Sequence, residues 1–181
     1  FLDAVKELSE RAGVKINFDL KTDYKKDNNI INILEIATNW FEKNLSLDNN
    51  ECLNYLKKRS ISEETTKIFR LGYSYNKKTS LYEYLKNLSF HDDEILKSNL
   101  VKKDVNNKFK DFFYRRLIFP INNIQGKVVG FGGRVLDNSN PKYINSPESD
   151  YFKKRSILYN LNLAKDTARR KRNLLICEGY M

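Results

Sequence analysis

The sequence has few of the residues that disulfide frameworks and zinc sites require. Its 181 residues include two cysteines and one histidine. Cys52 and Cys177 lie far apart among apolar neighbours, which predicts two buried, reduced thiols. Two cysteines and one histidine cannot complete the ligand set of a structural zinc site. His91 opens an acidic stretch, and we interpret it as a helix-start residue.

Long hydrophobic runs are also missing. No apolar run approaches the roughly 18 residues that a membrane span requires. Phe1 begins directly in a polar helical pattern, without a targeting segment. Hydrophobic residues nevertheless make up 40% of the chain and aromatic residues 13%, enough for a folded core. These features predict a cytoplasmic protein that does not contact a membrane.

Acidic residues are fewer than basic ones, and the excess of positive charge is uneven. The chain carries 33 Lys or Arg against 23 Asp or Glu, a net charge of +10. Residues 127–172 hold eleven of the basic residues and four of the acidic ones, a local charge of +7 that leaves +3 for the remainder. This asymmetry favours a polyanionic partner on one face. The alternative is that lysine is simply a common surface residue in a composition rich in Lys, Asn and Ile.

The first part of the chain is predicted to be helical. Trp40 lies on the apolar face of its helix and is expected in the core. The pairs Ser80 with Glu83 and Ser89 with Asp92 resemble capping boxes and predict two short helices. The expected elements are a helix in 2–12, a polar linker in 16–28, helices in 30–44, 53–59 and 62–69, a connecting strand in 71–74, and the two capped helices in 80–98.

From about residue 110 the pattern changes to strands. Residues 112–121 and 127–136 are β-rich runs separated by a turn, which predicts a β-hairpin. Residues 156–169 return to a helical pattern, with Leu158 and Leu161 expected to face inward. Residues 174–177 are wholly apolar, as is typical of a buried parallel strand. The fold class is therefore α+β, a helical amino-terminal part followed by a small antiparallel β-rich subdomain.

Three consecutive segments near the carboxyl end combine glycine, basic and polar residues. Gly130 to Arg134 lies within a strand pattern, so it is not a dinucleotide-binding loop. Its glycines indicate a β-bulge or a close backbone approach, and they could also let a phosphate chain lie against the backbone beside Arg134. Pro141 to Pro147 contains one cation, one ring and small polar donors, which suits a sugar-phosphate backbone and a stacked base. The alternative for this loop is ordinary turn chemistry.

The chain ends with an apolar run followed by Glu178 and Gly179. A carboxylate at the carboxyl end of a strand lies where open α/β sheets bind ligands. Carboxylates are natural ligands of Mg²⁺, but a single carboxylate does not make a site. The remaining ligands are expected outside these residues.

Together these segments closely resemble the RNA-polymerase core of bacterial replicative primases of the DnaG type. Five ordered motifs carry the resemblance: R-x-x-FPI at 116–121, VxGFGGR at 128–134, PKYxNSPE at 141–148, FxKxxxLY at 152–159 and EGYM at 178–181. In addition, YLKKRSIS at 55–62 resembles YLxxRGLS, with Ser60 in place of glycine.

The resemblance implies how the chain is divided and which residues act. Residues 1–28 would be a helix and linker, 29–172 the amino-terminal subdomain of the catalytic core, and 173–181 the first strand of an incomplete TOPRIM domain. Glu178 matches the first TOPRIM acid and would be a catalytic residue and a metal ligand. The implied contacts to template and nucleotide are Arg59, Arg116, Arg134, Lys142, Tyr143, Asn145 and Lys154. Arg155-Ser156 stands where the family often has Gly-Arg.

The resemblance also implies the activity of a longer parent protein. It would be a DNA-directed RNA polymerase that makes short RNA primers on single-stranded DNA from ribonucleoside triphosphates, with Mg²⁺ or Mn²⁺. Its other partners would be the RNA–DNA primer duplex and a replicative helicase, bound through a missing carboxy-terminal region. Zinc is expected only in a missing amino-terminal module, and the isolated piece is expected to be inactive. The alternatives are a non-catalytic single-stranded-DNA-binding module, or another TOPRIM enzyme such as a topoisomerase or an OLD-type nuclease.

Overall fold

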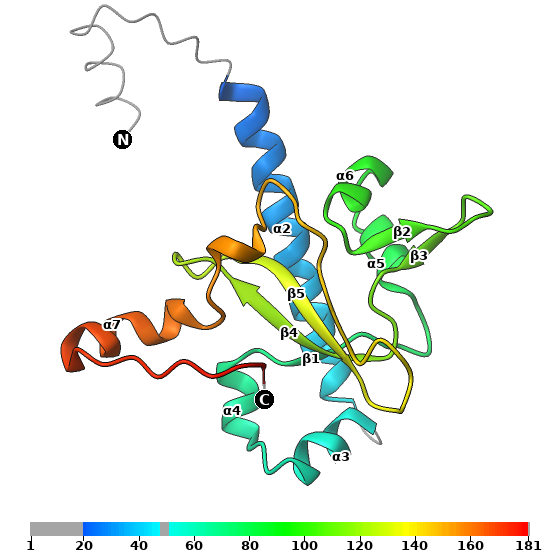
Figure 1. The fold of residues 1–181 in the computed structure, drawn as a ribbon. Coiled ribbons are helices and arrows are strands. Elements are labelled where there is room, and N and C mark those ends of the chain that lie inside the picture. The colour runs from blue at the N-terminus through cyan, green and yellow to red at the C-terminus, as the bar shows by residue number, and fades with distance from the viewer. Residues whose placement is uncertain (1–19, 48–50, 181) are drawn as a thin grey trace, which may run out of the picture.

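The computed structural model describes residues 20–47 and 51–180, and only the backbone of residues 20–28. Short helices surround one long helix and two antiparallel sheets (Figure 1). The helices are α2 (Leu20–Leu45), α3 (Glu51–Lys58), α4 (Glu63–Ile68), α5 (Leu81–Asn87), α6 (Asp92–Lys97), the 3₁₀ turn η1 (Lys154–Ser156) and α7 (Leu161–Lys171). The strands are β1 (Gly72–Tyr73), β2 (Val101–Lys103), β3 (Phe109–Asp111), β4 (Arg116–Asn122), β5 (Val128–Val135) and β6 (Tyr143–Asn145).

The main sheet has the strand order β1-β4-β5-β6, and every neighbouring pair is antiparallel. The predicted hairpin forms its centre: β4 pairs with β5 in regular register from Arg116 opposite Val135 to Ile121 opposite Gly130. An irregularity follows between Ile121 and Asn122, next to the turn. The predicted connecting strand is β1, whose Gly72 pairs with Ile118. Strands β2 and β3 form a separate two-stranded sheet.

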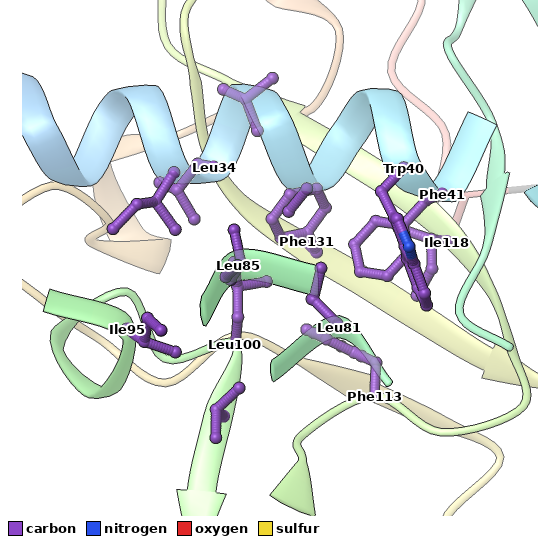
Figure 2. Close-up of a cluster of buried hydrophobic side chains, with 14 of the residues drawn as sticks. Leu34, Trp40, Phe41, Leu81, Leu85, Ile95, Leu100, Phe113, Ile118 and Phe131 are labelled. Atoms are coloured by element: carbon purple, nitrogen blue, oxygen red, sulfur yellow. The ribbon is translucent and has the colours of Figure 1, made fainter. Parts of the chain in front are cut away.

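Helix α2 covers one face of the main sheet. The Phe41 ring meets the Phe131 ring of β5 edge to face, with 5.4 Å between centroids. Trp40 is 5% exposed, as predicted, and packs edge to face against Phe41. Figure 2 shows side chains from α2, α5, α6 and β5 meeting in this core. Each fully buried side chain of this kind contributes on the order of 2 kcal/mol by leaving water.

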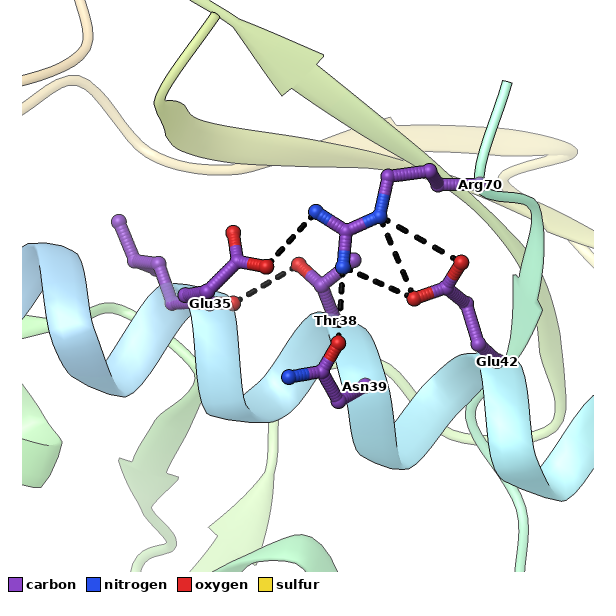
Figure 3. A network of polar contacts seen from close by, with 6 residues as sticks. Glu35, Thr38, Asn39, Glu42 and Arg70 are labelled. Atoms are coloured by element: carbon purple, nitrogen blue, oxygen red, sulfur yellow. Dashed lines mark hydrogen bonds and ion pairs between the residues drawn. The ribbon is translucent and has the colours of Figure 1, made fainter. Parts of the chain in front are cut away.

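A network around Arg70 attaches the end of α4 to the outer surface of α2 (Figure 3). Its guanidinium lies 2.8 Å from a Glu35 carboxylate oxygen and 2.9 Å from one of Glu42, and it donates to Asn39 at 2.8 Å. Burial alone would lower the pKa of Arg70, but hydrogen bonds to Glu42 and Glu35 raise it overall. The planar guanidinium offers five donors in a fixed fork, and here Nε, Nη1 and Nη2 all find partners among Glu35, Asn39 and Glu42.

Two helix boundaries differ from the sequence prediction. Helix α2 begins at Leu20, inside the predicted linker, because residues 20–28 contain no Pro or Gly and extend an established helix at little cost. Helix α6 is capped by His91, not Ser89: the His91 amide donates to the Glu94 carboxylate at 3.1 Å. Ser89 has φ +66°, outside the extended region that an N-cap requires. The capping box at Ser80 is confirmed. The predicted helix at 2–12 lies outside the described residues.

The carboxyl-terminal part differs more. Helix α7 begins at Leu161 instead of 156, after Asn160 takes φ +61°, and none of its residues is buried. Residues 174–177 are not a strand; Leu175 is 88% exposed, and Cys177 is exposed rather than buried. A buried parallel strand needs a neighbouring strand and two covering layers, and the described residues place neither beside this run. Cys52 is buried, as predicted.

No helix within 20–47 and 51–180 combines the length and apolarity that crossing a membrane requires.

Candidate nucleic-acid interface

The sheet face opposite α2 brings three of the predicted site residues together. Arg134 of β5 pairs with Tyr143 of β6, and Gly132 pairs with Asn145. Because alternate residues of a strand share a face, Arg134, Tyr143 and Asn145 lie on the same side of the sheet. We call these three residues, with the neighbouring Tyr55 and Tyr180, the sheet-face cluster.

Arg134 lies between two aromatic rings. Its guanidinium is 4.3 Å from the ring centroid of Tyr55 on α3 and 5.7 Å from that of Tyr143. Nη1 donates to the Val135 carbonyl at 3.0 Å, whereas the buried Nε has no hydrogen-bond partner among the described residues. Arg134 is half-buried, because the cation–π contacts draw it onto the tyrosine rings.

Tyr180 of the EGYM segment packs onto this face. Its ring stacks on Phe119 of β4 with centroids 4.9 Å apart, and its hydroxyl donates to Asn145 Oδ1 at 2.8 Å. A Cβ at Gly132 would lie 2.7 Å from the Tyr180 ring, so only glycine leaves the room that this ring needs. Burial raises the pKa of the Tyr180 hydroxyl, which therefore remains a hydrogen-bond donor.

The glycines of β5 thus allow aromatic rings to pack closely against the strand. A Cβ at Gly130 would lie 3.1 Å from the Phe152 ring, and one at Gly133 would lie 2.5 Å from Phe113 on the opposite face. The pairing with β4 is regular at all three glycines, so the bulge expected here is absent from this stretch. Of the interpretations of the run from Gly130 to Arg134, the structure confirms that other groups approach the backbone closely.

Arg116 is nearly buried and donates to backbone carbonyls. It is 9% exposed, and its Nη1 donates to the carbonyls of Pro141 at 3.1 Å and Gly133 at 3.3 Å. Burial lowers its pKa. The contact to Pro141, which follows a cis peptide bond, connects β4 to the loop that carries Lys142. In this structure Arg116 therefore supports the loop.

The remaining predicted cations are exposed. Lys142 precedes β6, and its carbonyl accepts from the Val135 amide at 3.1 Å, which extends the β5–β6 ladder. Lys154 lies in η1, where its amide donates to Glu148 Oε1 at 3.1 Å. Arg59 follows α3 and precedes Ser60, whose φ of +56° explains why glycine suits this position in the resembled motif. Arg59 contacts the sheet-face cluster through its backbone, since its amide donates to the Tyr55 carbonyl at 3.1 Å.

Comparison with known proteins decides the family. Residues 40–165 match the family described as the DNA primase catalytic core, N-terminal domain. The chain belongs to this family. This family match replaces the alternatives of a topoisomerase or an OLD-type nuclease.

Known primases and their structures agree with the family match. The DNA primase of Deinococcus radiodurans is 35% identical over the whole chain, which covers 31% of that protein. The RNA polymerase domain of Mycobacterium tuberculosis primase DnaG is 29% identical and superposes with a TM-score of 0.78, over 84% of this chain and 50% of that one. A DnaG primase catalytic domain bound to single-stranded DNA is 28% identical, with a TM-score of 0.71 over 80% and 47%. The chain spans less than a third of the curated relatives it matches first.

Glu178 lies at the surface of the protein. Its carboxylate is exposed, next to Gly179 with φ +90°. Among residues 20–47 and 51–180, no group of three His, Cys, Asp or Glu side chains is arranged to hold a metal ion. The described residues on their own therefore do not fit a divalent cation.

Two residues of the sheet-face cluster were not among the predicted site residues. Tyr55 lies one helical turn before Arg59 and stacks on Arg134. Tyr180 follows Glu178 and binds Asn145. Both belong to motifs that carried the resemblance, so the signal was present, but only the folded structure shows that Tyr55 contacts Arg134 and that Tyr180 contacts Asn145.

Proposed function

We propose that the sheet-face cluster and Lys142 bind single-stranded template DNA or the incoming nucleotide in a bacterial primase. The observation that carries this proposal is the arrangement of Arg134, Tyr143 and Asn145 on one sheet face beside the exposed Lys142. A guanidinium and an ammonium can contact phosphates, the half-exposed Tyr143 ring can stack on a base, and the Asn145 side chain can bond to base or sugar. The primase relative solved with single-stranded DNA supports single-stranded DNA as the ligand.

For the longer protein we propose template-directed synthesis of RNA primers. Ribonucleoside triphosphates, Mg²⁺ or Mn²⁺, a primer duplex and a replicative helicase would be its further substrates and partners. Glu178 would supply one carboxylate to the metal site. In a protein extended through the rest of the catalytic core, Glu178→Gln should therefore abolish primer synthesis while leaving single-stranded DNA binding intact. Undiminished synthesis by that variant would refute the assignment of Glu178.

The DNA contact can be tested on the 181-residue chain. Binding of a fluorescent oligothymidylate should weaken with salt, by about 0.7 log units per log unit of salt for each phosphate contacted. Tyr143→Ala should lower affinity about 5-fold or more if a base stacks on the ring, whereas Tyr143→Phe, which keeps the ring, should not. Flat salt dependence, or equal affinities of the two variants, would contradict the proposal.

A further inference from the structure

The Tyr180 hydroxyl engages one end of the Asn145 side-chain amide. It donates to Asn145 Oδ1 at 2.8 Å, although the two residues lie 35 positions apart in sequence. An amide has a carbonyl oxygen that accepts hydrogen bonds and an NH₂ group that donates them. Asn145 is exposed, so a ligand on the sheet face can reach it. Because Tyr180 engages Oδ1, the end of the amide that is left for a ligand is Nδ2, with its two N–H donors.

The backbone around Asn145 is already fixed by the sheet. Asn145 pairs with Gly132 in the β5–β6 ladder. The next residue, Ser146, is buried; its amide donates to the Phe131 carbonyl at 2.8 Å, and its hydroxyl accepts from the Phe131 amide at 2.9 Å. The last torsion of an asparagine side chain is broad and roughly two-fold, so a fixed backbone does not decide which end of the amide faces outward. The bond from Tyr180 supplies that restraint.

The Tyr180 ring is itself held by its neighbours. It stacks on Phe119 with an interplanar angle of 14°, and Tyr159 meets it edge to face with centroids 4.8 Å apart. On the strand side the ring lies so close to Gly132 that a Cβ there would be 2.7 Å away. These contacts fix the plane of the ring, and the hydroxyl therefore has a defined position from which to hold Asn145.

We propose that Tyr180 is a positioning residue for ligand recognition, whose hydroxyl holds the Asn145 amide so that Nδ2 donates to an acceptor oxygen of the bound strand. This inference rests on the proposed function, which assigns Asn145 a contact to the ligand. Fixing a side chain in its binding orientation beforehand lowers the entropy that is lost on binding. Tyr180 thus tightens the contact without touching the ligand itself. The acceptor oxygen can belong to a base or to the sugar-phosphate backbone.

Removing a single hydroxyl tests this role. Tyr180→Phe keeps the stacked ring, loses the bond to Asn145 and should weaken binding of an oligothymidylate to the 181-residue chain about 3-fold. Asn145→Ala should weaken binding at least as much, and adding Tyr180→Phe to it should cause no further loss. Tyr159→Phe is the matched control, because it removes the hydroxyl of the neighbouring ring and should leave the affinity unchanged. A loss that also occurs with an abasic strand of equal length assigns the acceptor to the backbone, and a loss confined to the oligothymidylate assigns it to a base.

NMR spectra separate orientation from stability. In the wild-type chain the two side-chain amide protons of Asn145 should shift when the oligothymidylate is added, because Nδ2 becomes a donor to the strand. In Tyr180→Phe this shift should shrink, because the amide is no longer held. A variant that is merely less stable would keep the full shift in its folded fraction, and that result would contradict the positioning role.

The remaining outcomes distinguish this inference from the proposed function. Weaker binding by Asn145→Ala with wild-type affinity of Tyr180→Phe would overturn the positioning role and leave the proposed function intact. A further loss on adding Tyr180→Phe to Asn145→Ala would also overturn it, because the hydroxyl would then act elsewhere. If Asn145→Ala and Lys142→Ala both bind as well as Lys97→Ala, which alters an exposed lysine of α6, the proposed function fails and the positioning role fails with it.

Discussion

On each face of strand β5 a glycine lets an aromatic ring approach the backbone closely, but the residues around the two contacts differ. Toward α2, Phe131 packs against Phe41, and Gly133 makes room for the ring of Phe113. Toward the other side, Gly132 makes room for the ring of Tyr180, but there the neighbours are Arg134 and Asn145. The first contact is enclosed by hydrocarbon, and the second is bordered by polar groups and solvent.

This difference separates stability from recognition within one strand. Apolar burial on the α2 face contributes most of the free energy of folding. The opposite face keeps a cation and an amide near the surface, which costs stability unless their polar atoms find partners. The buried Nε of Arg134, which has no partner among the described residues, shows that this requirement is incompletely met on the second face.

The largest expected effect is on the α2 face. Phe131→Ala removes a fully buried ring from contact with Phe41 and Phe113, and should lower the free energy of unfolding by about 3–5 kcal/mol. Tyr143→Ala, an exposed ring on the other face, should cost less than about 1 kcal/mol. Urea unfolding of both variants measures the comparison. Similar losses for the two would show that the faces do not differ in this way.

Gly132→Ala should have the next largest effect. The added Cβ would lie 2.7 Å from the Tyr180 ring, so we expect a loss of about 1–3 kcal/mol. A double-mutant cycle gives the decisive measurement, because Tyr180→Ala removes the ring that the new methyl group would meet. The cost of Gly132→Ala should shrink in that background. An unchanged cost would mean that the strand itself, and not Tyr180, requires glycine.

Arg134→Ala should destabilise the protein by about 1–2 kcal/mol, because the side chain is half-buried and packs on two tyrosine rings. Arg59→Ala is the matched control, since Arg59 is exposed and should change stability by less than about 0.5 kcal/mol. Thermal unfolding of the two variants tests this difference. If both behave alike, the tyrosine contacts contribute no measurable stability, and Arg134 serves binding alone.

The sequence predicted elements well wherever local signals determine them. The hairpin of β4 and β5 follows from alternation around a turn, and α5 begins after Ser80 as its capping pattern indicates. The apolar face of α2 correctly placed Trp40 in the core. Each of these features depends on residues within a few positions of one another.

The features that the sequence did not predict depend on contacts between residues that are distant in sequence. Nothing near Arg116 or Arg134 in sequence shows that one is buried against Pro141 and the other lies on Tyr55. The run at 174–177 has the composition of a buried strand, yet strand formation depends on partners that local composition cannot supply. The sequence therefore predicted which residues make up the candidate site. Their arrangement in space depends on the register of β5 with β6, which the sequence does not give.

Lys142→Ala should have the smallest effect on stability and a clear effect on binding. The side chain is exposed, and the contacts of this residue with Val135 and Arg116 involve its backbone carbonyl, which alanine retains. The free energy of unfolding should change by less than about 0.5 kcal/mol. If Lys142 contacts phosphate, the salt slope of single-stranded DNA binding should fall by about 0.7, and Lys97→Ala should leave it unchanged. A destabilised Lys142→Ala variant with an unaltered salt slope would make Lys142 a structural residue, and the polar face of β5 and β6 would then lack its most exposed candidate for phosphate contact.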